Sequence, residues 1–259
     1  MIVSLSGRRG NMSELEGTKA VVVGASRGFG RGIVEALVEA GAEVHALSRG
    51  DASEVVRATG GRAHAIRADA AHPETPSRIL REIEPTVVVL NAGATPQIAP
   101  FREQTWDAFS TNWNADVKIV FQWLKAIVDQ PLADGSSVVT LSSGAALRGS
   151  PLSGGYAGAK AMVAFLTEYV AQDVARMKLR IRFATLLPTI SPEGGVGRQA
   201  VEAYARRQGR TVEQFLGGPP LTPADVGAAV LRLLRDRSLD EQIAFRLDHV
   251  GLTPLKRGT

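Results

Sequence analysis

The 259-residue chain contains no cysteine, which excludes disulfide bonds, thiolate nucleophiles and zinc sites built from cysteine. A reducing compartment fits this composition, and we expect a cytoplasmic protein. Aromatic residues make up only 5% of the chain, and its 30 lysines and arginines are scattered along the whole sequence. Because nucleic-acid-binding proteins gather basic and aromatic residues on one element, we predict no nucleic-acid partner.

Long apolar runs are also lacking. The longest, at 20–25 and 86–94, are far shorter than the ~20 residues that a membrane span requires, so no membrane partner is predicted. The first sixteen residues have too few apolar side chains for a secretory signal, and we expect a flexible tail, with Met12 as an alternative translation start. The four histidines show no metal-ligand spacing, and no metal site is predicted.

Short β-rich runs alternate with helical patterns along the rest of the chain. The expected strands lie at 19–23, 43–47, 63–66, 86–90, 136–141, 180–186 and 242–247, and the clearest helices at 28–40, 105–129, 155–177 and 223–236. Several strands are apolar without alternation, as expected when both faces of a sheet are covered. The pattern predicts a single α/β domain over 17–259, a Rossmann-like, doubly wound parallel sheet with helices on both faces.

One segment, 188–222, breaks this alternation. It carries proline and glycine at both ends and an amphipathic helical pattern between them. Because it follows a strand, it lies at the carboxyl edge of the sheet, where such folds bind ligands. We predict a lid over a substrate pocket, with a surface excursion as the alternative. Its arginines could receive an anionic substrate or form a solvated helix face; they are Arg198, Arg206, Arg207 and Arg210.

A glycine-rich loop joins the first strand to its helix. Gly24 permits a sharp exit from the strand, Gly28 lets backbone approach a pyrophosphate, and Gly30 lets the helix pack closely on the strand. Free N–H groups and the helix dipole favour an anion at this helix N-terminus. The loop therefore predicts a dinucleotide site, with a purely structural glycine turn as the alternative.

The end of the second strand distinguishes between NADP and NAD. Ser48 and Arg49 stand there, and no carboxylate occurs before Asp51. A carboxylate would repel a 2′-phosphate, whereas a guanidinium can hold it with two hydrogen bonds. Arg27, within the glycine loop, offers a second positive charge. NADP(H) is therefore favoured over NAD(H), with solvated arginines as the alternative.

Four short motifs follow one another in order. They are Gly24-Ala-Ser-Arg-Gly28-Phe-Gly30, Asn91-Ala-Gly93, Ser143 thirteen residues before Tyr156, and Tyr156-Ala-Gly-Ala-Lys160, with Pro188 after the sixth strand. In these motifs the chain resembles the short-chain dehydrogenase/reductase family over residues 18–237. The resemblance implies an NADP(H)-dependent oxidoreductase that interconverts a carbonyl and an alcohol on a small-molecule substrate. A non-catalytic NADP(H)-binding sensor or scaffold that keeps the fold is the alternative.

The resemblance also implies which residues form the site. The expected cofactor-binding residues are Gly24, Ser26, Arg27, Gly28, Phe29, Gly30, Ser48, Arg49, Asp69, Asn91, Ala92, Gly93, Tyr156, Lys160 and Pro188. Asp69 matches a residue that touches the adenine. Assembly as a homotetramer or homodimer through the helices at 105–129 and 155–177 is implied in the same way.

Tyr156 is the expected acid/base of the reaction. Lys160 lies four residues further on the same helix face, where its ammonium is expected to lower the pKa of the phenol and to hold the nicotinamide ribose. Ser143 is expected to donate a hydrogen bond to the substrate oxygen. The family's fourth member is an asparagine on the preceding helix, for which we expect Asn114, with Asn112 as the alternative.

Two positions depart from the family pattern. Thr189 follows Pro188 where glycine is usual, and Ala184 replaces a common asparagine in the sixth strand. Both border the expected nicotinamide and substrate region, so they leave the substrate class open.

Overall fold

The computed structural model describes residues 15–193 and 197–256. Most of the tail expected at 1–16 therefore lies outside the described residues. Leu15, at its end, donates its amide to the carbonyl of Ala40 over 3.0 Å and packs against the core. No helix in the described parts of the chain is long and apolar enough to cross a membrane.

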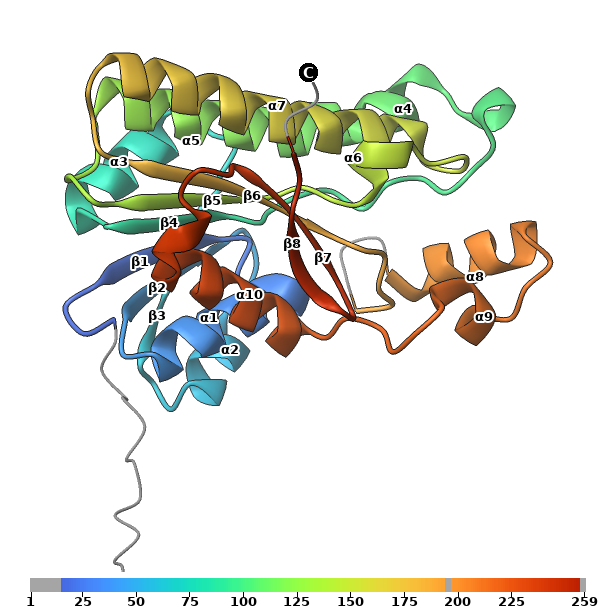
Figure 1. The fold of residues 1–259 in the computed structure, drawn as a ribbon, viewed down its shortest axis with the longest axis horizontal. Coiled ribbons are helices and arrows are strands. Elements are labelled where there is room, and N and C mark those ends of the chain that lie inside the picture. The colour runs from blue at the N-terminus through green and yellow to red at the C-terminus, as the bar shows by residue number, and fades with distance from the viewer. Residues whose placement is uncertain (1–14, 194–196, 257–259) are drawn as a thin grey trace, which may run out of the picture.

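A single twisted sheet forms the centre of the molecule (Figure 1). Within the described residues it has eight strands in the order β3-β2-β1-β4-β5-β6-β7-β8. Their bounds are β1 (Lys19–Val23), β2 (Glu43–Ser48), β3 (Ala63–Arg67), β4 (Val87–Leu90), β5 (Ser137–Leu141), β6 (Arg182–Pro188), β7 (Ala244–Asp248) and β8 (Gly251–Pro254). The first seven pair in parallel, which confirms the predicted doubly wound fold. β8 was not predicted; it is short, partly exposed and antiparallel to β7.

Helices cover both faces of this sheet (Figure 1). On one face lie α1 (Gly28–Glu39), α2 (Ser53–Ala58) and α10 (Pro223–Arg235). On the other lie α3 (Glu74–Ile83), α5 (Lys118–Asp129) and α7 (Gly154–Arg176), with α4 (Trp106–Asn112) and α6 (Ala145–Arg148) at one end. Short 3₁₀ turns stand at Phe101–Glu103 and Arg237–Leu239.

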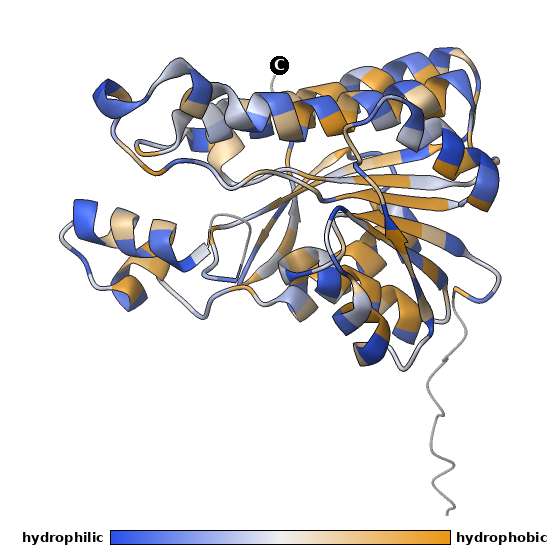
Figure 2. Cartoon of the chain, turned by 180° about the vertical axis from the view of Figure 1, so that it is seen from behind, coloured by the Kyte–Doolittle hydropathy of each residue, from blue (hydrophilic) through white to orange (hydrophobic). Residues whose placement is uncertain are grey.

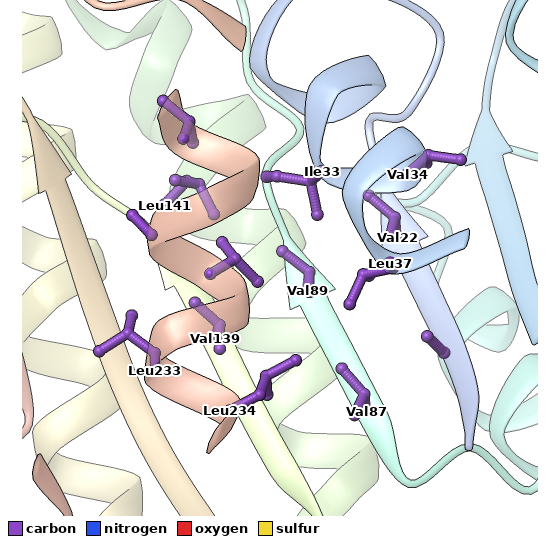
Figure 3. Packing of buried hydrophobic residues seen from close by; sticks show 14 of the residues in the cluster. Val22, Ile33, Val34, Leu37, Val87, Val89, Val139, Leu141, Leu233 and Leu234 are labelled. Carbon is purple, nitrogen blue, oxygen red and sulfur yellow. The ribbon is translucent and has the colours of Figure 1, made fainter. Parts of the chain in front are cut away.

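The core has two halves because both sheet faces are apolar. On one side Ile33 and Leu37 of α1 lie over Val22 and Val89, and Leu233 of α10 belongs to the same buried cluster (Figure 3). On the other, the fully buried Trp123 anchors the cluster beneath α3, α5 and α7. Apolar residues follow the strands and the inner helix faces, and hydrophilic residues lie along the outer helix faces (Figure 2). Burial on both faces explains the unbroken apolar runs in the sequence.

The helices α1 and α10 touch through backbone. A Cβ at Gly32 would stand 2.1 Å from the carbonyl oxygen of Pro223, and one at Gly227 would stand 2.5 Å from that of Gly32. Thr222 caps α10 by accepting a hydrogen bond from the amide of Asp225, as predicted from its position before a proline. This crossing fixes the first turn of α1 beside the start of α10.

The helix predicted at 105–129 is interrupted. α4 ends at Asn112, a π-helical turn (η2) covers Trp113–Val117, and α5 begins at Lys118. A π turn adds a residue to one turn of helix and so changes which side chains face inward, and such turns are frequent at functional sites.

The described residues of the segment 188–222 form two short helices rather than one. They are α8 (Gly197–Arg207) and α9 (Val212–Leu216), and they extend beyond the carboxyl end of the sheet (Figure 1). Tyr204 of α8 is buried, and its hydroxyl hydrogen-bonds with Ser150 and with Ser153, the latter at 2.9 Å. The inner face of α8 is therefore docked on the loop that precedes α7. Its arginines are exposed, namely Arg198, Arg206, Arg207 and, just beyond the helix, Arg210.

Candidate active site

A cleft of about 1450 Å³ opens at the carboxyl ends of the parallel strands. It runs from the glycine loop past the ends of β2, β4 and β5 to the first turns of α7 and the inner face of α8. Every site residue predicted from the sequence lines this cleft except Gly30. A Cβ at Gly30 would stand 2.0 Å from the carbonyl oxygen of Gly24, so this glycine serves close packing.

The glycine loop has the backbone that its sequence predicts. Gly24 and Gly28 have φ angles of 84° and 53°, in the left-handed region that favours glycine. A Cβ at Gly24 would lie 2.5 Å from the Cα of Ala92. Asn91 donates its side-chain amide to the carbonyl of Gly24 over 2.8 Å. The loop and the Asn-Ala-Gly motif therefore form one close-packed unit along the cleft.

The N-terminus of α1 faces this unit without a side-chain cap. Arg27 occupies the N-cap position in an extended conformation, and no acidic residue stands in the first turn. The first N–H groups of a helix lack partners within it, and they carry the positive end of its dipole. The free N–H groups of this first turn therefore fit the pyrophosphate of a dinucleotide, whose oxygens would accept their hydrogen bonds.

The residues at the end of β2 and directly after it, 48–51, place no carboxylate in the lining of the cleft. Ser48 is buried and donates its hydroxyl to the carbonyl of Gly50, whereas Arg49 and Arg27 are exposed. Neither guanidinium forms an ion pair within the described part of the chain. Asp51 is turned away from the cleft and accepts hydrogen bonds from the hydroxyl and amide of Ser53, which lower its pKa. Two free cations therefore border the expected ribose position.

Ser143, Tyr156 and Lys160 converge at the other end of the cleft. Tyr156 and Lys160 stand one turn apart on α7, with Nζ 5.8 Å from the centre of the phenol ring. Ser143 follows β5 and lines the cleft together with Tyr156, and its hydroxyl acts to lower the pKa of the phenol. α7 reaches this place because Gly155 lets it touch α4: a Cβ there would stand 1.9 Å from the carbonyl oxygen of Phe109.

The ammonium of Lys160 is buried, with 6% of the residue exposed. It donates to the carbonyl of Leu141 over 3.1 Å and lies 3.0 Å from Oδ2 of Asp116. Asp116 was not singled out in the sequence, although a carboxylate inside an otherwise apolar helix face is a recognisable signal. It is the acidic group that η2 brings to Lys160.

The two asparagines expected near Lys160 lie in different places. Asn114 is exposed on η2, lines the cleft and donates to the hydroxyl of Ser110 over 3.3 Å. Asn112 is buried and donates its amide to the carbonyl of Ala94 and to Oδ1 of Asp116. Within the described residues no hydrogen bond joins either asparagine to Lys160.

Lys160 acts to lower the pKa of Tyr156, as expected, but it does not decide the net direction of the shift. Burial raises the pKa of Tyr156 above its usual value, and the charge of Asp116 adds to the rise. Lys160 and the Ser143 hydroxyl act in the opposite direction without outweighing burial. Burial alone would favour the neutral amine of Lys160, but Asp116 and Tyr156 together raise its pKa. The ammonium thus stays charged beside a protonated phenol.

Comparison with known proteins identifies the family. The family model described as short chain dehydrogenase matches residues 18–192. The chain therefore belongs to the short-chain dehydrogenase/reductase family, and it is an oxidoreductase acting on CH–OH and C=O groups.

Particular relatives extend along most of the chain. It is 28% identical over 228 residues to L-xylulose reductase from Bos taurus, covering 86% of this chain and 91% of the relative. It is 26% identical over 233 residues to carbonyl reductase [NADPH] 2 from Sus scrofa, with the same coverage, 86% and 91%. Among solved structures, a short chain dehydrogenase from Burkholderia cenocepacia in complex with NADP aligns with a TM-score of 0.75 and 25% identity. That alignment covers 90% of this chain and 97% of the other.

Proposed function

We propose that the protein is an NADP(H)-dependent carbonyl reductase in which Tyr156 is the acid that protonates the carbonyl oxygen. One observation carries the proposal. Ser143, Tyr156 and the charged Lys160 converge at one end of a cleft whose other end is an uncapped helix N-terminus behind a glycine loop.

The cofactor site is assigned along the cleft. The glycine loop and the first turn of α1 would hold the pyrophosphate, Arg27 and Arg49 the 2′-phosphate, and Asp69 the adenine side. Residues 91–93, Pro188 and Lys160 would hold the nicotinamide half. When bound, the cofactor supplies or accepts the hydride. The NADP complex of the Burkholderia structure and the NADPH in the name of the porcine relative support the choice of NADP(H).

Ser143 then stabilises the developing negative charge, and Tyr156 transfers the proton. The hydroxyl of Ser143 donates a hydrogen bond to the substrate oxygen, which stabilises the negative charge that develops there during reduction. The phenol of Tyr156 gives its proton to that oxygen, and in alcohol oxidation the phenolate takes it back. The raised pKa keeps the phenol protonated at neutral pH, which is the state that a proton donor in the first direction requires.

A small hydroxylated ketone or aldehyde is the substrate class that the lining favours. Beyond Tyr156 the cleft is bordered by the hydroxyls of Ser150, Ser153, Thr189 and Tyr204. We assign residues 188–222 as a lid whose helices α8 and α9 close this end, since α8 is already docked through Tyr204. The sugar reductase among the relatives is consistent with a polar substrate.

Assembly and compartment complete the proposal. Large apolar side chains are exposed on η2, α5 and α7, namely Trp113, Phe121, Phe165 and Tyr169. The last two stack at 6.0 Å between ring centres. An exposed group of this size marks an interaction surface, and we assign it to a homodimer or homotetramer. The absence of cysteine supports a cytoplasmic location.

The test is NADPH oxidation by the purified protein against a panel of ketones, aldehydes and sugars, with Tyr156→Phe alongside. NADPH binding is measured for both proteins by fluorescence. Turnover by the wild type that is lost in the variant, with binding retained, is the expected result. Turnover that survives in the variant overturns the mechanism, whereas binding without turnover of any panel member favours the non-catalytic sensor.

A further inference from the structure

The buried carboxylate of Asp116 lies opposite the lysine of the site. Only 1% of Asp116 is exposed, and its Oδ2 lies 3.0 Å from Nζ of Lys160. Oδ2 has no hydrogen-bond donor among the described residues apart from this ammonium. A buried carboxylate is costly unless it is paired, so the ion pair is the interaction that permits it.

Three features of the chain hold this carboxylate in place. Oδ1 accepts hydrogen bonds from the amide of Ala94 over 2.8 Å and from the side chain of Asn112 over 3.2 Å. Asp116 lies in the π-helical turn η2, which directs it toward α7. A Cβ at Gly93 would lie 2.6 Å from Oδ2, so the glycine of the Asn-Ala-Gly motif leaves room for it.

The ion pair of Asp116 and Lys160 determines the electrostatic field at the phenol of Tyr156. The charged and titratable groups that act on it are Lys160 from α7, Asp116 from η2 and Tyr204 from α8. A lone ammonium would favour the phenolate, but an adjacent carboxylate offsets part of its field. Asp116 itself favours the protonated phenol.

We propose that Asp116 is a positioning residue that fixes the ammonium of Lys160 and offsets its charge, so that Tyr156 stays protonated and the site favours carbonyl reduction over alcohol oxidation. The inference rests on the proposed function for its direction of reaction. The electrostatic effect of Asp116 and Lys160 on Tyr156 does not depend on any substrate.

The direct test is an ultraviolet titration of tyrosine ionisation in the cofactor-free protein. The wild-type curve minus that of Tyr156→Phe isolates this phenol, and circular dichroism defines the pH range in which each protein is folded. In Asp116→Asn, with the same subtraction, the titration of Tyr156 is expected at lower pH. Asp129→Asn is the matched control, because it removes the same charge from an exposed position on α5. An unmoved or higher titration in Asp116→Asn overturns the proposal.

A second variant covers the case in which Asp116→Asn does not fold. Asp116→Asn/Lys160→Met removes both charges together, so no unpaired charge remains buried. If Asp116 offsets part of the Lys160 field, Tyr156 in this variant titrates above its wild-type pH but below its pH in Lys160→Met, which keeps the carboxylate. Equal titrations in the double variant and in Lys160→Met refute the offset, because Asp116 would then have no effect on the phenol.

Kinetics give the functional readout once a substrate is known. Asp116→Asn is expected to move the acid limb of the pH profile of kcat for alcohol oxidation to lower pH, so that this kcat rises about tenfold at a fixed pH on that limb. A purely structural role would lower kcat at every pH without moving the limb, and that result overturns the proposal. Because the titrations need no substrate, a failure of the proposed reaction leaves them interpretable.

Discussion

The proposed preference for NADP(H) rests on two exposed arginines, and removing them provides a quantitative test. Arg27 and Arg49 line the cleft on either side of the expected ribose and have no acidic partner within the described residues. A hydrogen bond to a charged group contributes about 1.5–3 kcal/mol, and exposure reduces such contacts toward ~1 kcal/mol. We take about 1.4 kcal/mol for each arginine, which corresponds to roughly tenfold in the dissociation constant.

The assay is a fluorescence titration of NADPH and NADH, so it needs no substrate. Arg27→Ala and Arg49→Ala are each expected to weaken NADPH binding about tenfold, and the double variant about a hundredfold if the two sites are independent. NADH binding should change little. Arg57→Ala is the control, because Arg57 is exposed on α2 and does not line the cleft.

The dependence of NADPH binding on ionic strength provides a second test of the same arginines. Raising the ionic strength from 0.01 M to 0.15 M shortens the Debye length from about 30 Å to about 8 Å, so it should weaken NADPH binding in the wild type more than in the double variant. Equal losses for NADPH and NADH in the double variant would refute the reasoning. The arginines would then hold a part of the cofactor that both dinucleotides share.

Three further predictions concern the core, the lid and the assembly. Thr140→Val removes the hydroxyl that bonds to two buried partners, Thr167 and Thr185, and should lower the free energy of unfolding by about 2–3 kcal/mol in a denaturant titration. Thr185→Val leaves the other pair intact and should cost only about 1 kcal/mol; a larger loss there would contradict this account. Tyr204→Phe removes the hydroxyl that docks α8, so the KM of the substrate should rise several-fold with kcat changed less, and an unaltered KM would count against the lid. Phe165→Glu places a charge on the exposed apolar face and should give monomers by light scattering, whereas an unchanged mass would move the interface elsewhere.

The sheet and its order of elements could be predicted because each strand carries its own signal. Short β-rich runs, several of them apolar without alternation, predicted the seven parallel strands, and Thr222 with Pro223 predicted the start of α10. β8 gave no such signal, since its four residues include a glycine and a proline and are only partly buried.

The parts of the site that were not predicted depend on packing between distant segments. The π turn η2 has no sequence pattern of its own, and it exposes Asn114 while it buries Asp116. The spacing of Tyr156 and Lys160 predicts the attraction between them, and the effect of Lys160 on the phenol has the predicted sign. The spacing carries no information on burial or on a third charge, and burial is what raises the net pKa of Tyr156.

Both ends of the proposed lid lie against α1, the helix that begins the proposed cofactor site, and a kinetic consequence is expected. The hydroxyl of Ser191 bonds to the carbonyl of Leu221 over 2.6 Å, which joins the two ends. The carbonyl of Glu193 lies 3.1 Å from where a Cβ of Gly28 would be, and Pro223 touches Gly32. A lid that closed over substrate first would cover the glycine loop. The order of addition should therefore be cofactor before substrate, with the oxidised cofactor released last.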